Sequence, residues 1–340
     1  MKQQDYLSVG IDIAARTFHA AWGTAAHEVS QAIEYQQTQD EYKKLVKKLT
    51  VTGYTPAQIV VVIEATGTYW MCLARFLYEQ GFQVSVINPR QAYHFAQAHL
   101  QQAKTDALDA RMLARLGLSL SLKVWQAPSA AWEALYQRLV ERDNLVEMRQ
   151  MLRNQLHALR QRTRIDPTVE ARKQALIDDM DAQIKAIDRE LKAYLRQSEW
   201  ANMAECLLSI KGIGLLSAAW LLVITTGFST CDDAEQLASY LGVVPHPQHS
   251  GSSRRGYKST GKSGHARARR VLYQASVSAA SFNPAIKIFY DRLRANGKPV
   301  KVARVAATRK LVHLAFAIAT KEQHFDPLYH LSACQSAPTA

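Results

Sequence analysis

Four carboxylates in the first third of the chain have the types and positions that metal-dependent phosphoryl chemistry requires. Asp12 and Glu64 each end an apolar run, while Asp106 and Asp109 lie three residues apart. An acid at the end of a buried strand is costly unless a cation offsets its charge. Carboxylates that meet at one point can hold Mg²⁺, and pairs of such ions serve to cut or join phosphodiesters. The chain is therefore first interpreted as an Mg²⁺-dependent nucleic-acid enzyme.

A second concentration of reactive groups lies between Pro247 and Arg270, where serine and glycine alternate with cations and acids are absent. A serine there could attack phosphorus, because guanidinium groups nearby stabilise the charge of the transition state. The alternative is a solvated basic loop whose serines are spacers. Seven cations are predicted to grip a phosphate backbone: Arg254, Arg255, Lys258, Lys262, Arg267, Arg269 and Arg270.

A third motif, over residues 207–219, resembles a helix-hairpin-helix in which Gly212 and Gly214 form a tight turn. The backbone amides of such a turn can face a DNA phosphate and bind it without reading sequence. A plain helical turn is the alternative interpretation.

The composition favours a polyanionic partner, since 42 Lys and Arg outnumber 29 Asp and Glu and give a net charge of +13. A basic protein with no such partner is the alternative on charge alone. Four cysteines without a CxxC pair argue against a zinc site or a disulfide framework. The first residues lack the apolar stretch of a signal peptide, and no apolar run reaches the roughly 20 residues of a membrane span. We therefore expect a cytoplasmic protein that is free of membranes.

The elements that must position the acids follow from hydrophobic periodicity. Short apolar or β-branched runs predict strands, and 3.6-residue spacing predicts helices, in the order β-β-β-α-β-α-β-α. The spacing of Asp106 and Asp109 places both on one face of the last helix. The predicted strands are 6–13, 16–22, 28–35, 59–63 and 83–87, the last closed by Pro89, and the predicted helices are 40–49, 69–79 and 106–116.

Residues 130–196 contain no glycine and show heptad-like spacing of leucine and isoleucine on both sides of Asp166-Pro167. Two helices joined near the proline explain this pattern, as an antiparallel hairpin or as an intermolecular coiled coil. The functional interpretation is a dimerising spacer, and the alternative is a helical pair folded onto a neighbouring domain. Residues 302–319 predict a further amphipathic helix.

The order of elements over residues 5–118, together with the four acids, resembles the α/β ribonuclease-H-like fold in its RuvC-like variant. Several segments along the chain together resemble the bridge-RNA-guided transposases of insertion sequences. These pair a RuvC-like DEDD domain with a serine-bearing, mainly α transposase domain. The matching segments are 10–12, 64–69, 86–89, 104–113 and 250–256, with 210–214 and 295–298 in addition.

This resemblance implies four regions. They are a RuvC-like DEDD domain (1–125), a coiled-coil helical spacer (126–199), a serine transposase domain with the helix-hairpin-helix (200–330) and a disordered tail (331–340).

The resemblance also implies a recombinase that excises and inserts its mobile element. The metal-site acids fall on Asp12, Glu64, Asp106 and Asp109, with Mg²⁺ as cofactor. The nucleophile falls on Ser250, which would form a phosphoserine link to DNA; Ser252 and Ser253 lie close enough for an error of register. Implied partners are donor and target DNA, a bridge RNA encoded by the element, and further copies of the chain, as dimers that assemble into a tetramer with composite sites.

Two other functions remain open at this point. A junction-resolving nuclease would use the same acids with water as the nucleophile, so Ser250 would be dispensable. An architectural nucleic-acid binder, whose acids merely cap structure, would need no divalent metal.

Overall fold

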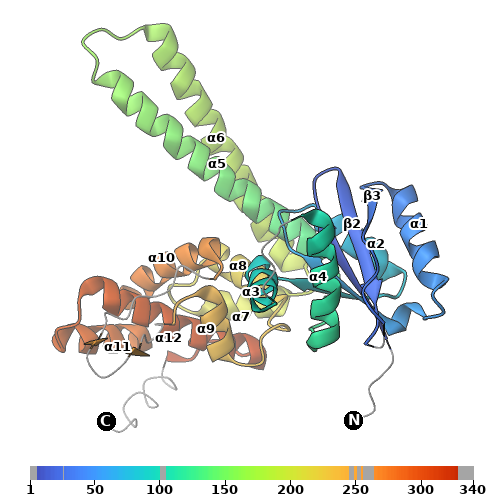
Figure 1. Cartoon of the computed structure of the whole chain (residues 1–340). Helices are drawn as coiled ribbons and strands as arrows, with labels where there is room; N and C mark the ends of the chain where they lie inside the picture. The colour runs from blue at the N-terminus through green and yellow to red at the C-terminus, as the bar shows by residue number, and fades with distance from the viewer. Residues whose placement is uncertain are drawn as a thin grey trace. The chain divides into compact units, whose positions relative to one another are not determined.

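The computed structural model divides the chain at residue 127 into two units, each with an apolar core of its own. The structure describes residues 6–25, 27–99, 105–244, 249–250, 254–255 and 264–327. Figure 1 shows the sheet unit in blue and turquoise and the helical unit in green to red.

A five-stranded mixed sheet in the order β3-β2-β1-β4-β5 forms the centre of the N-terminal unit. The first three strands form an antiparallel meander, whereas β4 and β5 run parallel to β1. The central strands are buried on both faces, as their continuous apolar runs predict. The strands are β1 (Leu7–Ile13), β2 (Thr17–Gly23), β3 (Ile33–Gln36), β4 (Ile59–Glu64) and β5 (Gln83–Ile87).

Helices cover both faces of this sheet. Apolar residues of α1 and α2 share a buried cluster with Val9 and Ile11 of β1. Leu113 of α4 packs on the other face with Val62 of β4, and Phe95 of α3 joins that cluster. The helices are α1 (Gln39–Thr50), α2 (Trp70–Glu79), α3 (Pro89–Ala98) and α4 (Asp106–Ser119), with a 3₁₀ turn at Pro56–Gln58.

Helix α4 packs unusually close to β1 because Gly10 has no side chain. A Cβ at Gly10 would overlap the carbonyl oxygen of Ala110. Farther along, the hydroxyl of Tyr6 donates to the carbonyl oxygen of Gly117 at 2.9 Å. Helix α4 therefore runs antiparallel to β1, so its first turn lies at the end of β1 that carries Asp12.

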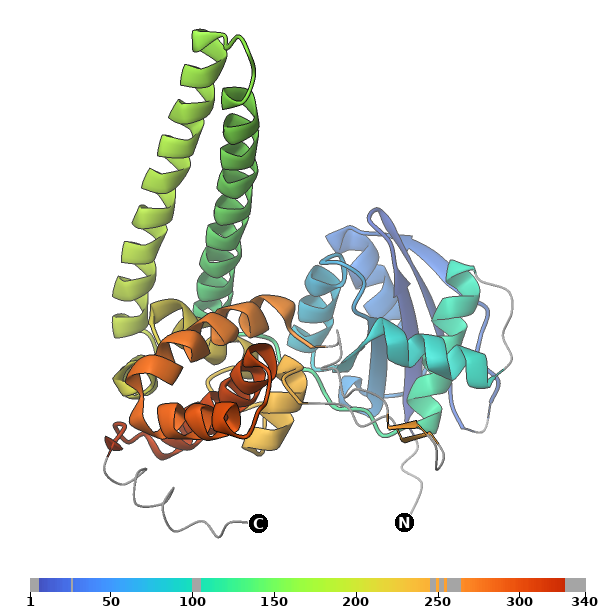
Figure 2. The same ribbon diagram turned by 90° about the vertical axis from the view of Figure 1, so that its left-hand side faces the viewer.

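Two 31-residue helices, α5 (Ala130–Arg160) and α6 (Pro167–Gln197), form an antiparallel hairpin within one chain (Figure 2). The Asp166 side chain caps α6 by accepting from the Thr168 amide at 2.8 Å. Ion pairs link the two helices along their length, including Arg142 to Asp188 at 2.6 Å. Leucines at the base of both helices belong to the core of the helical unit. The sequence allowed a hairpin or an intermolecular coiled coil, and the structure has the hairpin.

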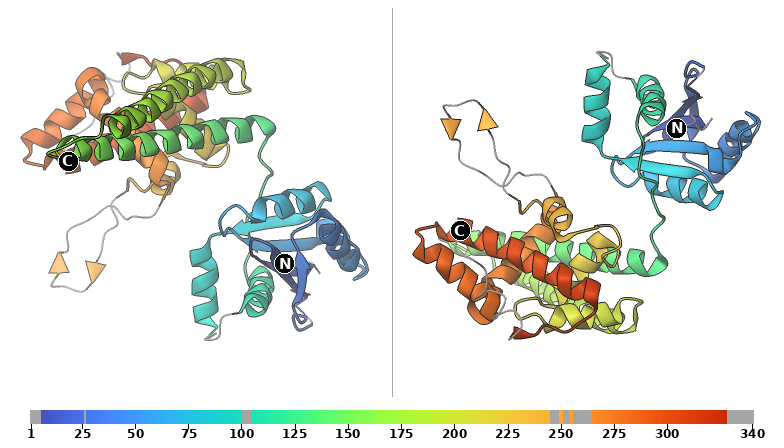
Figure 3. Two further views of the ribbon diagram at one scale, coloured as in Figure 1. Left: turned by 90° about the horizontal axis from the view of Figure 1, so that it is seen from above. Right: turned by 90° about the horizontal axis from the view of Figure 1, so that it is seen from below.

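In the described part of the helical unit, the six helices after the hairpin share a core that contains the fully buried Trp220 of α8. The long red helix in the right-hand view of Figure 3 is α12. A two-stranded antiparallel ribbon pairs β6 with β7. The elements are α7 (Ala201–Ser209), α8 (Leu215–Thr225), α9 (Ala234–Leu241), β6 (His249–Ser250), β7 (Arg254–Arg255), α10 (Ala266–Phe282), α11 (Pro284–Ala295) and α12 (Val300–Lys321).

The predicted fold class is confirmed as a mixed α/β sheet unit followed by a mainly helical remainder. Two element predictions were wrong. The third strand starts at Ile33 instead of residue 28, because the hydroxyl of Ser30, not a backbone carbonyl, accepts from the Trp22 amide at 3.1 Å. Pro89 not only closes β5 but also opens the unpredicted helix α3, which Asn88 caps by accepting from the Arg90 amide at 2.8 Å.

The RuvC-like and helix-hairpin-helix details stay predictions, as do the domain boundaries at 125 and 199. The predicted tail, 331–340, lies outside the described residues. Within the described part of the chain, no helix is long and apolar enough to cross a membrane.

Candidate active site

Asp12 and Glu64 lie side by side at the ends of two central strands. Ile11 pairs with Ile63 in the parallel ladder between β1 and β4, and the two acids take the next position on each strand. Residues at the same register of a parallel pair point to the same face of the sheet. The Thr66 hydroxyl donates to Glu64 Oε1 at 2.9 Å, which orients this carboxylate.

The other two acids belong to the first turn of α4. Thr105 caps this helix by accepting from the Leu108 amide at 3.3 Å. Asp106 is exposed and Asp109 is half-buried. Acids commonly occupy a first helical turn because they offset the helix dipole. The antiparallel packing of α4 on β1 nevertheless brings this turn to the edge of the sheet where Asp12 lies.

Electrostatics link all four acids. The pKa of Asp12 is raised to about 6, first by burial and then by the charges of Asp109, Asp106 and Glu64. The amide of Ile13 opposes this shift as a hydrogen-bond donor but does not cancel it. The fold therefore concentrates negative charge from three distant parts of the sequence around one half-buried carboxyl group.

The four carboxylates fit Mg²⁺ in donor chemistry and in charge, since this ion takes oxygen ligands and its charge would relieve their repulsion. Their side chains are not drawn together into a coordination sphere. Across the described residues, no three His, Cys, Asp or Glu side chains converge closely enough to hold a metal ion. The structure therefore supports a concentration of negative charge at the predicted site. The described carboxylates do not, however, lie at the distances that metal ligands would need.

His19 is a candidate that the sequence analysis missed. It lies directly opposite Asp12 in the antiparallel ladder between β1 and β2. Cross-strand partners project to the same face of the sheet and lie about 5 Å apart at Cβ. The signal was the short β1–β2 connection, which fixes the register and hence the partner of Asp12.

Three of the predicted nucleic-acid cations make contacts inside the helical unit. Arg270 donates to Glu147 Oε1 at 2.9 Å and Asp143 Oδ2 at 3.4 Å, and Arg267 donates to Asn144 Oδ1 at 3.1 Å. In the same stretch, Arg269 donates to the carbonyl oxygen of Leu241 at 3.3 Å.

Asp143 explains why α5 attracts these arginines. Its side chain is only 7 % exposed, and burial raises its pKa while Arg270, Arg267 and Arg142 act in the opposite direction. A buried carboxylate is destabilising unless cations accompany it. The first turns of α10 are therefore fixed to α5 by charge.

Ser250 lies in the helical unit, where its backbone pairs with Arg254 across the β6–β7 ribbon. Arg255 is paired in the same ribbon with His249. The predicted contact residues Lys258 and Lys262 and the alternative nucleophiles Ser252 and Ser253 lie outside the described residues.

The turn between α7 and α8 packs against α10 and α11. Gly212 adopts φ +105°, and a Cβ there would lie 2.5 Å from that of Ala279. Asn283 donates to the carbonyl oxygen of Lys211 at 3.1 Å. Gly214 is the N-cap of α8, and a Cβ there would meet no other atom within 4 Å. The sequence thus identified a tight turn correctly. Within it, Gly212 allows close packing against α10.

Comparison with known proteins adds two matches to families. Residues 9–164 match a transposase family model of DEDD type from IS110 elements. Residues 204–291 match the family described as Transposase IS116/IS110/IS902.

Among known relatives, the chain is similar to the pilin gene-inverting protein of Moraxella bovis, with 30% identity over 332 residues, 95% of this chain and 98% of the relative. The pilin gene-inverting protein of Moraxella lacunata is similar to the same extent. A 43.6 kDa protein of insertion element IS110 from Streptomyces coelicolor is 29% identical over 206 residues, 58% of this chain and 50% of that protein.

Proposed function

This chain belongs to the IS116/IS110/IS902 family of transposases, and from that premise we propose that it excises and inserts a mobile DNA element through a covalent serine–DNA intermediate. Its relatives are named for insertion elements and for the inversion of a pilin gene. Breaking and rejoining DNA strands is the chemistry that both activities share.

The observation that carries this proposal is the charge concentrated around Asp12. Burial and three neighbouring carboxylates raise its pKa to about 6, which a structural role at a strand end would not require. We assign Asp12, Glu64, Asp106 and Asp109 to one catalytic cluster with Mg²⁺ as its cofactor. When bound there, Mg²⁺ would polarise the scissile phosphate and stabilise the leaving oxygen.

In the proposed reaction, Ser250 Oγ attacks phosphorus and the bond from phosphorus to the 3′ oxygen breaks. The DNA 5′ end is then joined to the serine, and the released 3′ oxygen takes up a proton. The guanidinium groups of Arg254 and Arg255 cannot accept the serine proton, because they stay protonated. The serine proton must therefore pass to another base.

Guidance by a structured RNA belongs to the same proposal. The net charge of +13 supports binding to both DNA and an RNA encoded by the element. Base pairing would then supply sequence specificity, while the protein grips the backbone. We also propose that copies of the chain assemble as dimers and tetramers around the nucleic acids.

Trapping the covalent intermediate tests the proposal. Purified protein, DNA carrying the element's end and RNA transcribed from its flank should give a serine-linked DNA peptide in mass spectrometry. Ser250→Ala should still bind both nucleic acids, because no charge is lost, but should form no adduct. Ser252→Ala and Ser253→Ala serve as matched controls and should form it.

Three outcomes would contradict parts of the proposal. DNA cleavage by Ser250→Ala without any adduct would favour a nuclease that uses water. Full recombination activity of Asp12→Ala, or of the wild-type protein in excess chelator, would contradict the metal-dependent mechanism. Recombination by the purified protein without any RNA would contradict the proposal that an RNA guides it.

A further inference from the structure

Both ends of the segment that carries Ser250 are held at one point of the helical unit. Gly242 ends α9 with φ +70°, and Gly264 precedes α10 with φ +100°. A Cβ on Gly264 would lie 2.7 Å from the backbone nitrogen of Gly242 and from the carbonyl oxygen of Tyr240. The His265 amide donates to that same carbonyl oxygen at 3.2 Å. Only glycine allows the two backbones to approach so closely.

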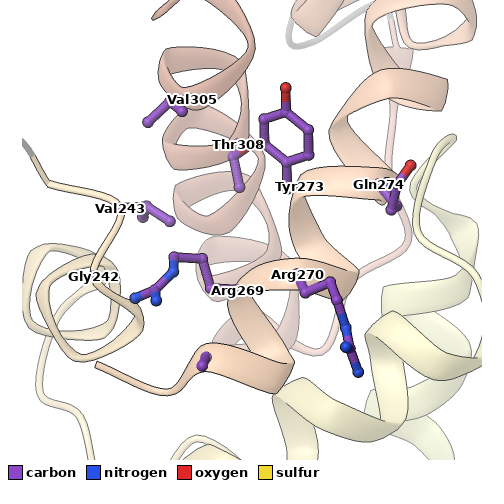
Figure 4. Close-up of a pocket in the computed structure, with 9 residues that line it drawn as sticks. Gly242, Val243, Arg269, Arg270, Tyr273, Gln274, Val305 and Thr308 are labelled. Atoms are coloured by element: carbon purple, nitrogen blue, oxygen red, sulfur yellow. The ribbon is translucent and has the colours of Figure 1, made fainter. Parts of the chain in front are cut away.

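A cavity of about 260 Å³ opens beside this contact, between the end of α9, one face of α10 and α12 (Figure 4). Val243 after α9 and Val305 of α12 both line it, and the Tyr273 ring lies between α10 and α12. Arg269 projects toward Gly242 within the same cavity.

The lining suits a flat ligand with apolar faces and a nearby negative charge. A free phosphate would lose its hydration against Val243, Val305 and the Tyr273 ring. A nucleobase can pack its faces against such walls and place its polar edge near the Gln274 amide, while its own phosphate lies near Arg269. The volume falls below the usual range of pockets for drug-sized ligands, about 300–1,000 Å³, so it suits one base and not a longer stretch.

We propose that this cavity receives one nucleobase of the DNA, turned out of its helix. This inference rests on the proposed function, since it requires DNA joined to Ser250. Turning a base out of the stack costs a few kcal/mol, which packing in the cavity offsets. The held base would fix the DNA relative to the helices that carry both ends of the serine segment.

Abasic scanning of the DNA combined with cavity variants tests the inference in the full-length protein with its RNA. Each nucleotide near the scissile phosphate is replaced in turn by an abasic site, and the rate of adduct formation is measured. One abasic position should slow the wild-type protein about tenfold, the effect of one stacked base. Tyr273→Ala should slow the reaction on intact DNA to a similar degree, whereas Tyr273→Phe should not.

The decisive comparison is the combination. On DNA with the critical abasic site, Tyr273→Ala should cause no further loss, because the two changes remove the same contact. Gln274→Ala, at an exposed position on α10, provides a second cavity variant that leaves the core intact. Gln155→Ala on α5, which lines a separate, open groove, is the matched control and should behave as wild type on every substrate.

The inference would be overturned if Tyr273→Ala and the abasic site each slowed adduct formation independently, so that their fold-changes multiplied. It would also be overturned if no abasic position slowed adduct formation by the wild-type protein. Either result with normal adduct formation on intact DNA leaves the proposed function standing. The absence of any adduct on intact DNA overturns the proposed function and this inference with it.

Discussion

Asp12 belongs to the proposed catalytic cluster and, when charged, lowers the stability of the fold. Burial of its carboxyl group, and then the charges of three further carboxylates, raise its pKa to about 6. Uncompensated charge of this kind destabilises the folded protein. A side chain that weakens the fold and yet is the centre of a charge cluster is typical of a site selected for reactivity.

Asp12→Asn should therefore stabilise the protein while abolishing recombination. The folded protein binds the Asp12 proton more tightly than the unfolded chain, so its contribution to stability is complete below about pH 4 and is lost as the pH rises to about 6. The full shift corresponds to about 3 kcal/mol, and partial exposure reduces the expected gain at pH 8 to about 1–2 kcal/mol. Urea unfolding of both proteins at pH 4 and pH 8 measures it.

Asp179→Asn, at an exposed position on α6, is the control and should change the free energy of unfolding little at either pH. Added Mg²⁺ should stabilise the wild-type protein at pH 8 more than it stabilises Asp12→Asn. An equal difference between wild type and Asp12→Asn at both pH values would contradict the electrostatic origin of the cost.

At the scale of elements, the packing of α4 on β1 decides whether the acids can act together. Ser8 of β1 donates to the carbonyl oxygen of Ala114 at 2.8 Å, and Gly10 lets the helix backbone approach the strand. Two small residues on one strand therefore set the position of Asp106 and Asp109.

Gly10→Ala should displace α4 and destabilise the N-terminal unit by about 3 kcal/mol or more, because the new methyl group would overlap the helix backbone. Gly53→Ala is the control in the same unit. Its surroundings are open, but its φ of +87° makes alanine cost about 1 kcal/mol. Thermal unfolding compares the two, and equal losses would contradict the close packing.

The elements that the sequence predicted best are those with strong local patterns. The β-branched run of β4 and the heptad leucines of α5 need no distant partner to be recognised. Helix α3 was missed because a proline after a strand fits both a strand end and a first helical position, and only the Asn88 cap separates these. The third strand was misplaced because a single serine hydroxyl interrupts its ladder.

The site was predictable to the extent that it depends on strand ends. Asp12 and Glu64 end neighbouring parallel strands, and their proximity follows from that topology. The contacts of Arg267 and Arg270 with α5 were not predictable. The composition of a basic segment does not reveal which distant residues its cations will contact. Their acceptors Asn144 and Glu147 lie 123 positions away in the sequence.

At the scale of the whole molecule, the two units are defined by separate cores. The N-terminal unit ends with the irregular segment after α4. In this segment, the Trp125 amide donates to the Val84 carbonyl oxygen at 2.7 Å. The Trp125 ring meets Trp70 and Tyr78 edge-on, with centroids 5.7 and 5.9 Å apart. The unit is therefore completed beyond its last helix.

A fragment of residues 1–127 should fold alone, and a fragment of residues 1–119 should be less stable by about 2–3 kcal/mol, because it loses this aromatic contact and the hydrogen bond. Circular dichroism during urea unfolding measures the difference. Trp125→Ala within 1–127 is the matched variant and should reproduce most of the loss. Equal stability of the two fragments would place the end of the unit at α4.

The close contact between Gly242 and Gly264 makes the serine segment exchangeable in principle. Both ends are fixed by backbone atoms of the scaffold, and Val243 at the first end also packs in the helical core, so a replacement segment must keep that residue. Evolution could replace this segment as a cassette while the helices stay unchanged, and protein engineers could graft the segment of one relative onto the scaffold of another at the same two glycines.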